Sequence, residues 1–351
     1  MNKIPYDITL HPGWWHKFAD VSFTERFFTD YIFRIEQDIK MRRTLYDFFG
    51  HLGWGEKLPQ PRPIIDTDLV AGEYLQALLL GCKIKYFANS YPETICKNMT
   101  EEEVEKLDVP RLDLNENWIN IEEQMEKLQK NFGYVESHLD LHGVQNLALS
   151  LRGQQLFVDY YQNKKTAKRL LSICTKLLIA VGKRIKKRSR VLSCGVTSIM
   201  HKVNPKIYVT SNCTVEMVSD KIYEEFLLEW DIKLSQNFSP FGIHHCGQST
   251  EHVAHVYKKI PNLSFLEVGA FSDIKKVRSV FPNIHLNLRY SPVKLKEITR
   301  KELKKDLMKM IEDSSPIDKI SFSCVGIDQY TPPEKVENFL ITMKEINNRI
   351  G

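Results

Sequence analysis

The chain has 351 residues, of which 42% are hydrophobic and 26% are charged, a composition typical of a soluble globular protein. Its formal net charge of +5 is too small to argue for a nucleic-acid partner, and no apolar run reaches the roughly 18 residues of a membrane span. The seven cysteines are scattered, and the first residues contain no apolar signal segment. We therefore expect a cytoplasmic protein with reduced thiols that binds neither nucleic acid nor a membrane.

An N-terminal extension is predicted for residues 1–62. Trp14 and Trp15 begin an aromatic stretch, and apolar residues recur at helical spacing between positions 27 and 49. Several glycines and prolines between positions 50 and 63 then indicate a loop. We interpret residues 1–62 as a helical and loop extension that packs on a catalytic domain of residues 63–351.

The first half of that domain offers two polar residues as substrate ligands. A helix is predicted over 66–81, and a strand over 134–141 leads through a glycine turn into a helix that contains Asn146 and Arg152. Both side chains are predicted to face a substrate. The guanidinium fork of Arg152 suits a carboxylate, although a surface salt bridge would explain the same residue.

Strand-like segments follow at 191–197 and 206–210, and the second ends in a loop with Asn212 and Cys213. We predict that both loop residues lie near the substrate. The thiol of Cys213 is a candidate further metal ligand, or else an ordinary half-buried cysteine. The basic run at 183–190 complements the end of a helix and lacks the interleaved aromatic residues of a single-strand binding surface.

The last third has the clearest pattern, because four strand–helix units follow one another. Successive units of this kind form a parallel sheet with right-handed crossovers. With the strands before them, eight strands are within reach, so we predict an α/β fold, a TIM (β/α)8 barrel with an N-terminal helical extension. In that fold the site lies at the carboxyl ends of the strands. The four strands are predicted at 241–246, 263–268, 284–289 and 319–324.

Metal-ligating side chains gather at these strand ends. His244 and Cys246 alternate along one strand and therefore share a face, and Cys324 lies at an equivalent strand end. One imidazole and two thiolates form a ligand set that selects zinc and leaves a fourth coordination position. Glu267 is a candidate fourth ligand or a support for the ligands, unless it pairs with a nearby cation. Arg289 ends the next strand.

This ligand set indicates a reaction class. A thiol bound to zinc has a lowered pKa and reacts as a thiolate, so alkyl transfer to a thiol is the reaction that the site favours. Glu267 and Arg289 are then the catalytic candidates. The same ligands would also fit a zinc ion that has only a structural role.

The stretch at 243–247, IHHCG, followed later by Cys324, resembles a known signature. It is similar to the uroporphyrinogen decarboxylase superfamily, and within it to the zinc-dependent, cobamide-linked methyltransferases, whose signature is His-x-Cys and a distant Cys. Residues 287–292 and 331–336 resemble the same superfamily. The resemblance implies a TIM barrel with zinc on His244, Cys246 and Cys324. It also implies methyl transfer between a corrinoid, carried by a partner protein, and a thiol or similar small-molecule acceptor.

The arginine-rich motif with which uroporphyrinogen decarboxylases hold substrate carboxylates is absent from residues 1–60. The chain also contains no corrinoid-binding domain that we can identify, so the resemblance places the cobamide on the partner. The alternative function within the same superfamily is decarboxylation of a small carboxylated substrate, anchored by Arg152 and Arg289.

Overall fold

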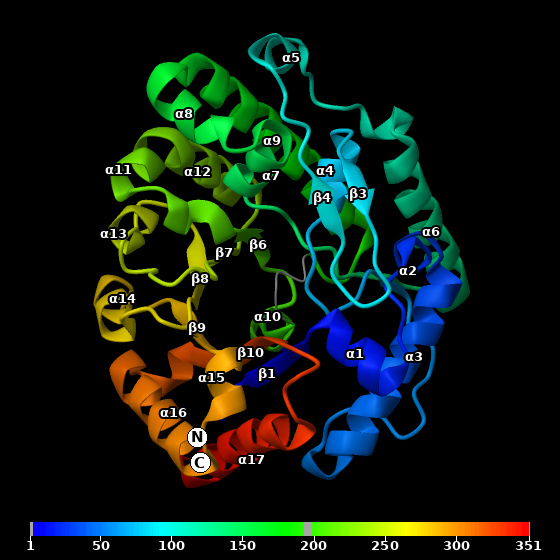
Figure 1. Ribbon diagram of the computed structural model, residues 1–351, viewed down its shortest axis with the longest axis vertical. Helices are drawn as coiled ribbons and strands as arrows, with labels where there is room; N and C mark the ends of the chain where they lie inside the picture. The colour runs from blue at the N-terminus through cyan, green and yellow to red at the C-terminus, as the bar shows by residue number, and fades with distance from the viewer. Residues whose placement is uncertain (1–2, 193–197, 351) are drawn as a thin grey trace.

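The computed structural model describes residues 3–192 and 198–350. Its main sheet has six parallel strands that curl into an open half-barrel, with helices on the outer side (Figure 1). In spatial order the strands are β1 (Tyr6–Leu10), β10 (Ile320–Ile327), β9 (His285–Tyr290), β8 (Leu263–Val268), β7 (Phe241–His244) and β6 (Tyr208–Ser211). The parallel strand–helix order predicted for the last third is confirmed.

Two short strands continue the curve beyond β6. β2 (Ile64–Ile65) and β5 (Glu136–Ser137) are parallel, and a parallel bridge between His142 and Ser211 joins this pair to the main sheet. Within residues 3–192 and 198–350 no ladder pairs β2 with β1, so hydrogen bonding does not close the ring there. The fold is therefore of the TIM-barrel type, but the fully closed barrel that the sequence predicts is not formed by the described strands.

Several predicted elements take a different form. The helix expected over 66–81 is reduced to α4 (Leu75–Leu79), and an irregular segment precedes it. Asp66 has a positive φ of 59°, which a helix does not allow, so the chain bends there. The strand predicted over 191–197 lies mostly outside the described residues. A small antiparallel hairpin, β3 (Lys83–Lys85) with β4 (Glu93–Ile95), stands apart from the barrel.

Residues 3–62 contain more than helices and loops. β1 pairs in parallel with β10, so this segment supplies an edge strand of the main sheet as well as three helices. Trp14 and Trp15 are buried and meet edge to face, with ring centroids 5.2 Å apart. Asp30 ends one helix and caps the next by accepting hydrogen bonds from two backbone N–H groups. The helices are α1 (Pro12–Ala19), α2 (Glu25–Thr29) and α3 (Tyr31–Phe49).

The remaining helices cover the outside of the sheet, except for α10 (Ile199–Val203), which is drawn within the ring of strands in Figure 1. None of the described helices is both long and apolar enough to cross a membrane. The outer helices of the first half are α5 (Glu101–Lys106), α6 (Glu116–Phe132), α7 (Val144–Arg152), α8 (Gln155–Gln162) and α9 (Lys164–Arg188). Those of the second half are α11 (Asp220–Ile222), α12 (Leu228–Asn237), α13 (Ala254–Tyr257), α14 (Ile274–Val280), α15 (Pro292–Glu297), α16 (Arg300–Ser314) and α17 (Pro333–Ile350).

The strand side chains divide into two layers. Every second residue is apolar and belongs to the main hydrophobic core that the helices cover. The alternate residues form the inner layer, in which Val209 and Phe265 pack with α10 in a small second apolar cluster and a row of polar side chains crosses neighbouring strands. This inner polar row consists of Ser211, His244, Glu267, Asn287 and Ser321. Its members Ser211, His244 and Glu267 lie at the carboxyl ends of β6, β7 and β8.

Candidate metal centre

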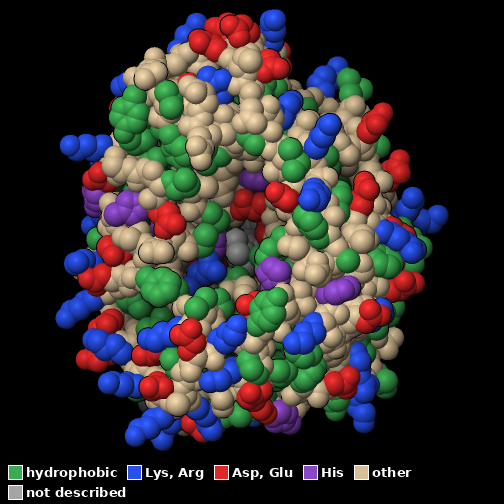
Figure 2. Space-filling view, viewed as in Figure 1, with side chains coloured by type: hydrophobic (Ala, Val, Ile, Leu, Met, Phe, Trp, Pro, Cys, Tyr) green, Lys and Arg blue, Asp and Glu red, His purple; other side chains and the backbone are tan. Residues whose placement is uncertain are grey.

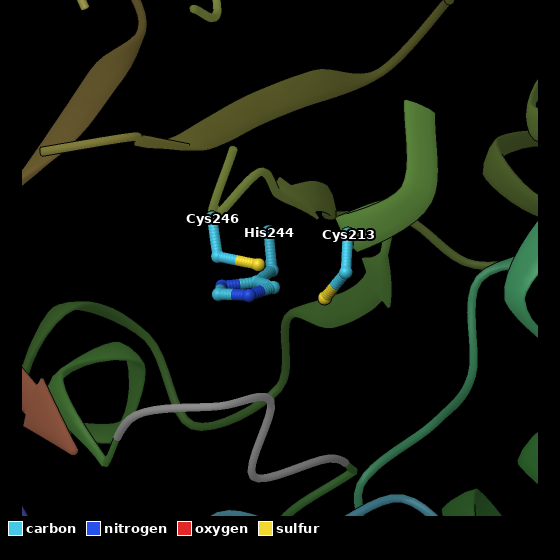
Figure 3. A group of neighbouring side chains, drawn as sticks. All are labelled: Cys213, His244 and Cys246. Atoms are coloured by element: carbon cyan, nitrogen blue, oxygen red, sulfur yellow. The ribbon is translucent and has the colours of Figure 1, made fainter. Parts of the chain in front are cut away.

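Three side chains with soft or borderline donor atoms meet at the ends of β6 and β7. Cys213 begins a 3-10 turn two positions after the end of β6, His244 is the last residue of β7, and Cys246 follows two positions after His244. Their ligand atoms all lie within 4.8 Å of one another, and the three side chains point toward one another in Figure 3. Two sulfurs and one imidazole nitrogen form the donor set that zinc prefers.

The imidazole of His244 is fixed by its neighbour on β8. Its Nδ1 hydrogen-bonds to the Glu267 carboxylate, and Glu267 also accepts a hydrogen bond of 3.2 Å from Asn287. If Nδ1 carries the proton, Nε2 presents a lone pair. Nε2 is buried and has no hydrogen-bond partner, a costly arrangement that a bound metal ion would relieve. The same geometry makes Glu267 a support that orients His244.

The charges of the cluster suit a metal ion. Burial opposes a charged imidazole, but Glu267 and then Cys246 raise the pKa of His244 to about 9. A hydrogen bond from Cys213, with His244 and Arg289 nearby, lowers the pKa of Cys246, whereas the pKa of Cys213 is raised by that hydrogen bond and by burial. Cys246 is therefore the thiolate of the pair and Cys213 its donor. Cys246 is exposed and can be reached from solvent.

Cys324, expected as the third ligand, lies apart from this cluster. On β10 the inner positions are Ser321 and Ser323, which hydrogen-bond to Asn287. Cys324 therefore faces the opposite way, where it is fully buried in the main hydrophobic core. Burial raises its pKa to about 12. The sequence predicted that Cys324 lies at a strand end, but it did not determine which face of the strand the side chain occupies. In the structure, the sulfur that lies near His244 and Cys246 is that of Cys213.

A cavity of about 370 Å³ opens beside the cluster at the carboxyl ends of the strands. Figure 2 shows this face hollowed at its centre, with acidic side chains inside the hollow. Arg289 lines the cavity and has one buried guanidinium nitrogen, Nη1, without a hydrogen-bond partner. The cavity is lined by Ala71, Gly72, Glu73, Tyr91, Asp140, Cys213, Arg289, Val325 and Gly326.

Two acidic residues of this cavity were not singled out from the sequence. Glu73 and Asp140 each have a buried carboxylate oxygen without a hydrogen-bond partner, Oε1 and Oδ1 respectively. Burial raises the pKa of Glu73 to about 7 and that of Asp140 well above its usual range. Asp140 lies near the end of the predicted strand at 134–141, and this position could have identified it as a candidate site residue. Glu73 lies in the irregular segment before α4, where no pattern marked it.

The other predicted substrate residues anchor the surrounding structure. Asn146 on α7 donates to Glu73 at 3.2 Å and accepts from the Thr214 hydroxyl at 2.7 Å, so it ties this helix to the loop of Cys213. Asn212 is buried and donates to Asp231 at 2.7 Å. Contact of either with a substrate stays a prediction.

Arg152 is engaged away from the cavity. Its guanidinium donates to Asp159 at 2.7 and 3.1 Å and also to the backbone carbonyl of Met99. It does not line the cavity beside Cys213. Its predicted role as an anion clamp for substrate has no support in this geometry.

No family model matches the chain, and no curated protein does. Solved structures do resemble it. A methyltransferase from Methanosarcina mazei is 15% identical with a TM-score of 0.66, over 99% of this chain and 95% of that chain. A B12-independent methionine synthase from a Shewanella species, in complex with selenomethionine, is 10% identical with a TM-score of 0.50, over 99% and 97% of the two chains. These likenesses show a shared fold over nearly the whole chain.

Proposed function

We propose that this protein is a zinc-dependent methyltransferase that moves a methyl group from a corrinoid, carried by a partner protein, to a small thiol. The observation that carries the proposal is the cluster of Cys213, His244 and Cys246, with His244 Nε2 unsatisfied, at the carboxyl ends of parallel strands. This is the end at which barrel enzymes place their sites. The fold that the chain shares with a protein described as a methyltransferase supports the same reaction class.

The chain's own residues would prepare the thiol acceptor. Zinc bound here would supply one property, a lowered pKa of the acceptor thiol. Cys213, His244 and Cys246 would hold the ion, and Glu267 would keep the imidazole in its ligating tautomer. The acceptor thiol would release its proton to solvent on binding. Its sulfur then forms the bond to the methyl carbon, while the donor keeps the electron pair of the broken bond.

The cavity favours an acceptor with charged groups of both signs. The unsatisfied oxygens of Glu73 and Asp140 would accept hydrogen bonds from an ammonium group, and Arg289 Nη1 would donate to a carboxylate. All three side chains line the space next to Cys213. An amino-acid thiol such as homocysteine combines these groups with the reacting sulfur. We infer that the acceptor belongs to this class.

Decarboxylation of a small acid remains the second candidate function, because Arg289 has a free donor in the cavity. The geometry supports it less well. Of the two arginines expected to anchor a carboxylate, Arg152 is paired with Asp159 instead.

The direct test uses anaerobically purified, zinc-loaded protein with methylcobalamin as the methyl donor. Homocysteine, cysteamine and 3-mercaptopropionate are compared as acceptors, and the change in corrinoid absorbance is followed. We expect transfer with wild type, the highest kcat/KM with homocysteine, and no transfer with Cys246→Ala. A folded, zinc-loaded wild type that methylates none of the three thiols would contradict the proposal. Equal kcat/KM for all three would overturn only the inference about the acceptor.

A further inference from the structure

A second group of metal-ligating side chains lies on the side of the barrel where β2 and β1 do not pair. Asp68 follows β2, His138 follows β5 and His201 is on α10, so three separate segments contribute. Their ligand atoms lie within 4.8 Å of one another. The two imidazole ring centroids are 5.2 Å apart.

His138 is the residue that most needs a partner. The relative exposure of its side chain is only 2%. Both ring nitrogens lack a hydrogen bond. The Glu136 carboxylate remains 3.9 Å from Nε2, beyond hydrogen-bond length. A buried imidazole without any partner is costly unless a ligand completes it.

Asp68 supplies a carboxylate that pairs with the guanidinium of Arg62. Arg62 bridges Asp68 and Asp38, which fixes the direction of the carboxylate. Around the cluster, Arg42 and Arg62 face three carboxylates, namely Asp38, Glu56 and Asp68.

We propose that Asp68, His138 and His201 form a second metal site for a divalent ion such as zinc. Two imidazoles and a carboxylate are a common ligand set for such ions, and this set lacks the sulfur of the first cluster. A cavity of about 260 Å³, lined in part by Asp68 and His201, leaves room for water at the remaining coordination positions. The bound ion would tie β2, β5 and α10 together on the side where the described strands leave the ring open.

The two clusters can be distinguished by metal content and by cobalt spectroscopy. Purified protein is loaded with zinc, and the bound metal is counted for wild type, Cys246→Ala, His138→Ala, His201→Ala and the exposed control His255→Ala. We expect two ions in wild type and in the control, and one in each of the other variants. In cobalt-loaded protein, sulfur charge-transfer bands should vanish in Cys246→Ala and persist in His138→Ala and His201→Ala.

The metal-content test does not require that every variant folds. If His138→Ala is unfolded, Cys246→Ala still decides the matter, since it must retain one ion with a cobalt spectrum free of sulfur bands. A wild type with a single ion that Cys246→Ala abolishes would overturn the proposal. So would two ions retained in folded His138→Ala and folded His201→Ala.

Discussion

The two sides of the barrel hold their polar side chains in different ways. From β6 round to β1 the sheet is continuous, and strand register alone sets His244 opposite Glu267 and Glu267 opposite Asn287. On the β2 and β5 side the strands are two residues long, and ion pairs such as Arg62 with Asp38 position the polar groups. The main sheet therefore positions its polar side chains before any ligand binds. On the β2 and β5 side, the positions of the polar groups depend on the ion pairs between them.

This difference predicts different consequences for metal removal. The cluster of Cys213, His244 and Cys246 lies on a rigid sheet edge, so losing its ion should abolish activity and leave the fold intact. The cluster of Asp68, His138 and His201 joins segments that no ladder of the described strands connects, so an ion there should add stability.

The largest effect is expected from Cys246→Ala. Removing the exposed thiolate leaves two ligands at the first cluster, too few for a tightly held zinc ion. Methyl transfer should fall by roughly a thousandfold or more, while the melting temperature of the metal-free protein changes little. Activity assays beside thermal unfolding would measure both. Cys96→Ala, a change at a partly exposed cysteine outside the cluster, serves as the control, and a variant that stays active would contradict the site.

Glu267→Gln should weaken zinc binding without abolishing it. The amide keeps the shape of the carboxylate but loses the charge that holds the His244 ring. Loss of such a support typically lowers metal affinity by about 10- to 100-fold. Competition with a chromophoric chelator would measure the change. An unaltered affinity would show that Glu267 does not position His244.

Arg152→Ala should affect stability and not substrate binding. It would leave the Asp159 carboxylate, which is 2% exposed, without its guanidinium partner. We expect a loss of about 2 kcal/mol in the free energy of unfolding, below the full cost of breaking a deeply buried pair. Urea denaturation checks this value. A raised KM with unchanged stability would instead restore Arg152 as a substrate ligand.

The zinc affinity of the first cluster should rise with pH. The pKa of His244 is raised to about 9 and that of Cys213 also lies above its usual value, so both hold protons in the metal-free protein near neutrality. Zinc must displace these protons, so affinity increases as pH rises toward 9, by about tenfold or more per unit. Chelator competition between pH 6 and 9 measures the slope. A flat profile would mean that the ligands are already deprotonated.

Much of this architecture could be read from the sequence where local pattern decides structure. Strand–helix alternation in the last third predicted the parallel sheet, and alternation along β7 predicted that His244 and Cys246 share a face. The structure brings these two residues together.

The remaining features depend on tertiary structure. The side of β10 on which Cys324 lies is fixed by the register with β9 and β1, which a single strand does not reveal. Glu73, Asp68 and His201 reach their clusters from an irregular segment or a short helix, where no periodicity indicates direction. The break between β2 and β1 likewise follows from how the whole chain packs.

The most direct test of the account asks which cysteine completes the first cluster. Cobalt-loaded wild type, Cys213→Ala and Cys324→Ala are compared under anaerobic conditions by the intensity of their sulfur charge-transfer bands. The structure predicts weaker bands and a lower metal affinity for Cys213→Ala, and a spectrum like that of wild type for Cys324→Ala, since Cys324 lies in the apolar core. A normal spectrum in Cys213→Ala together with weakened bands in folded Cys324→Ala would contradict the account.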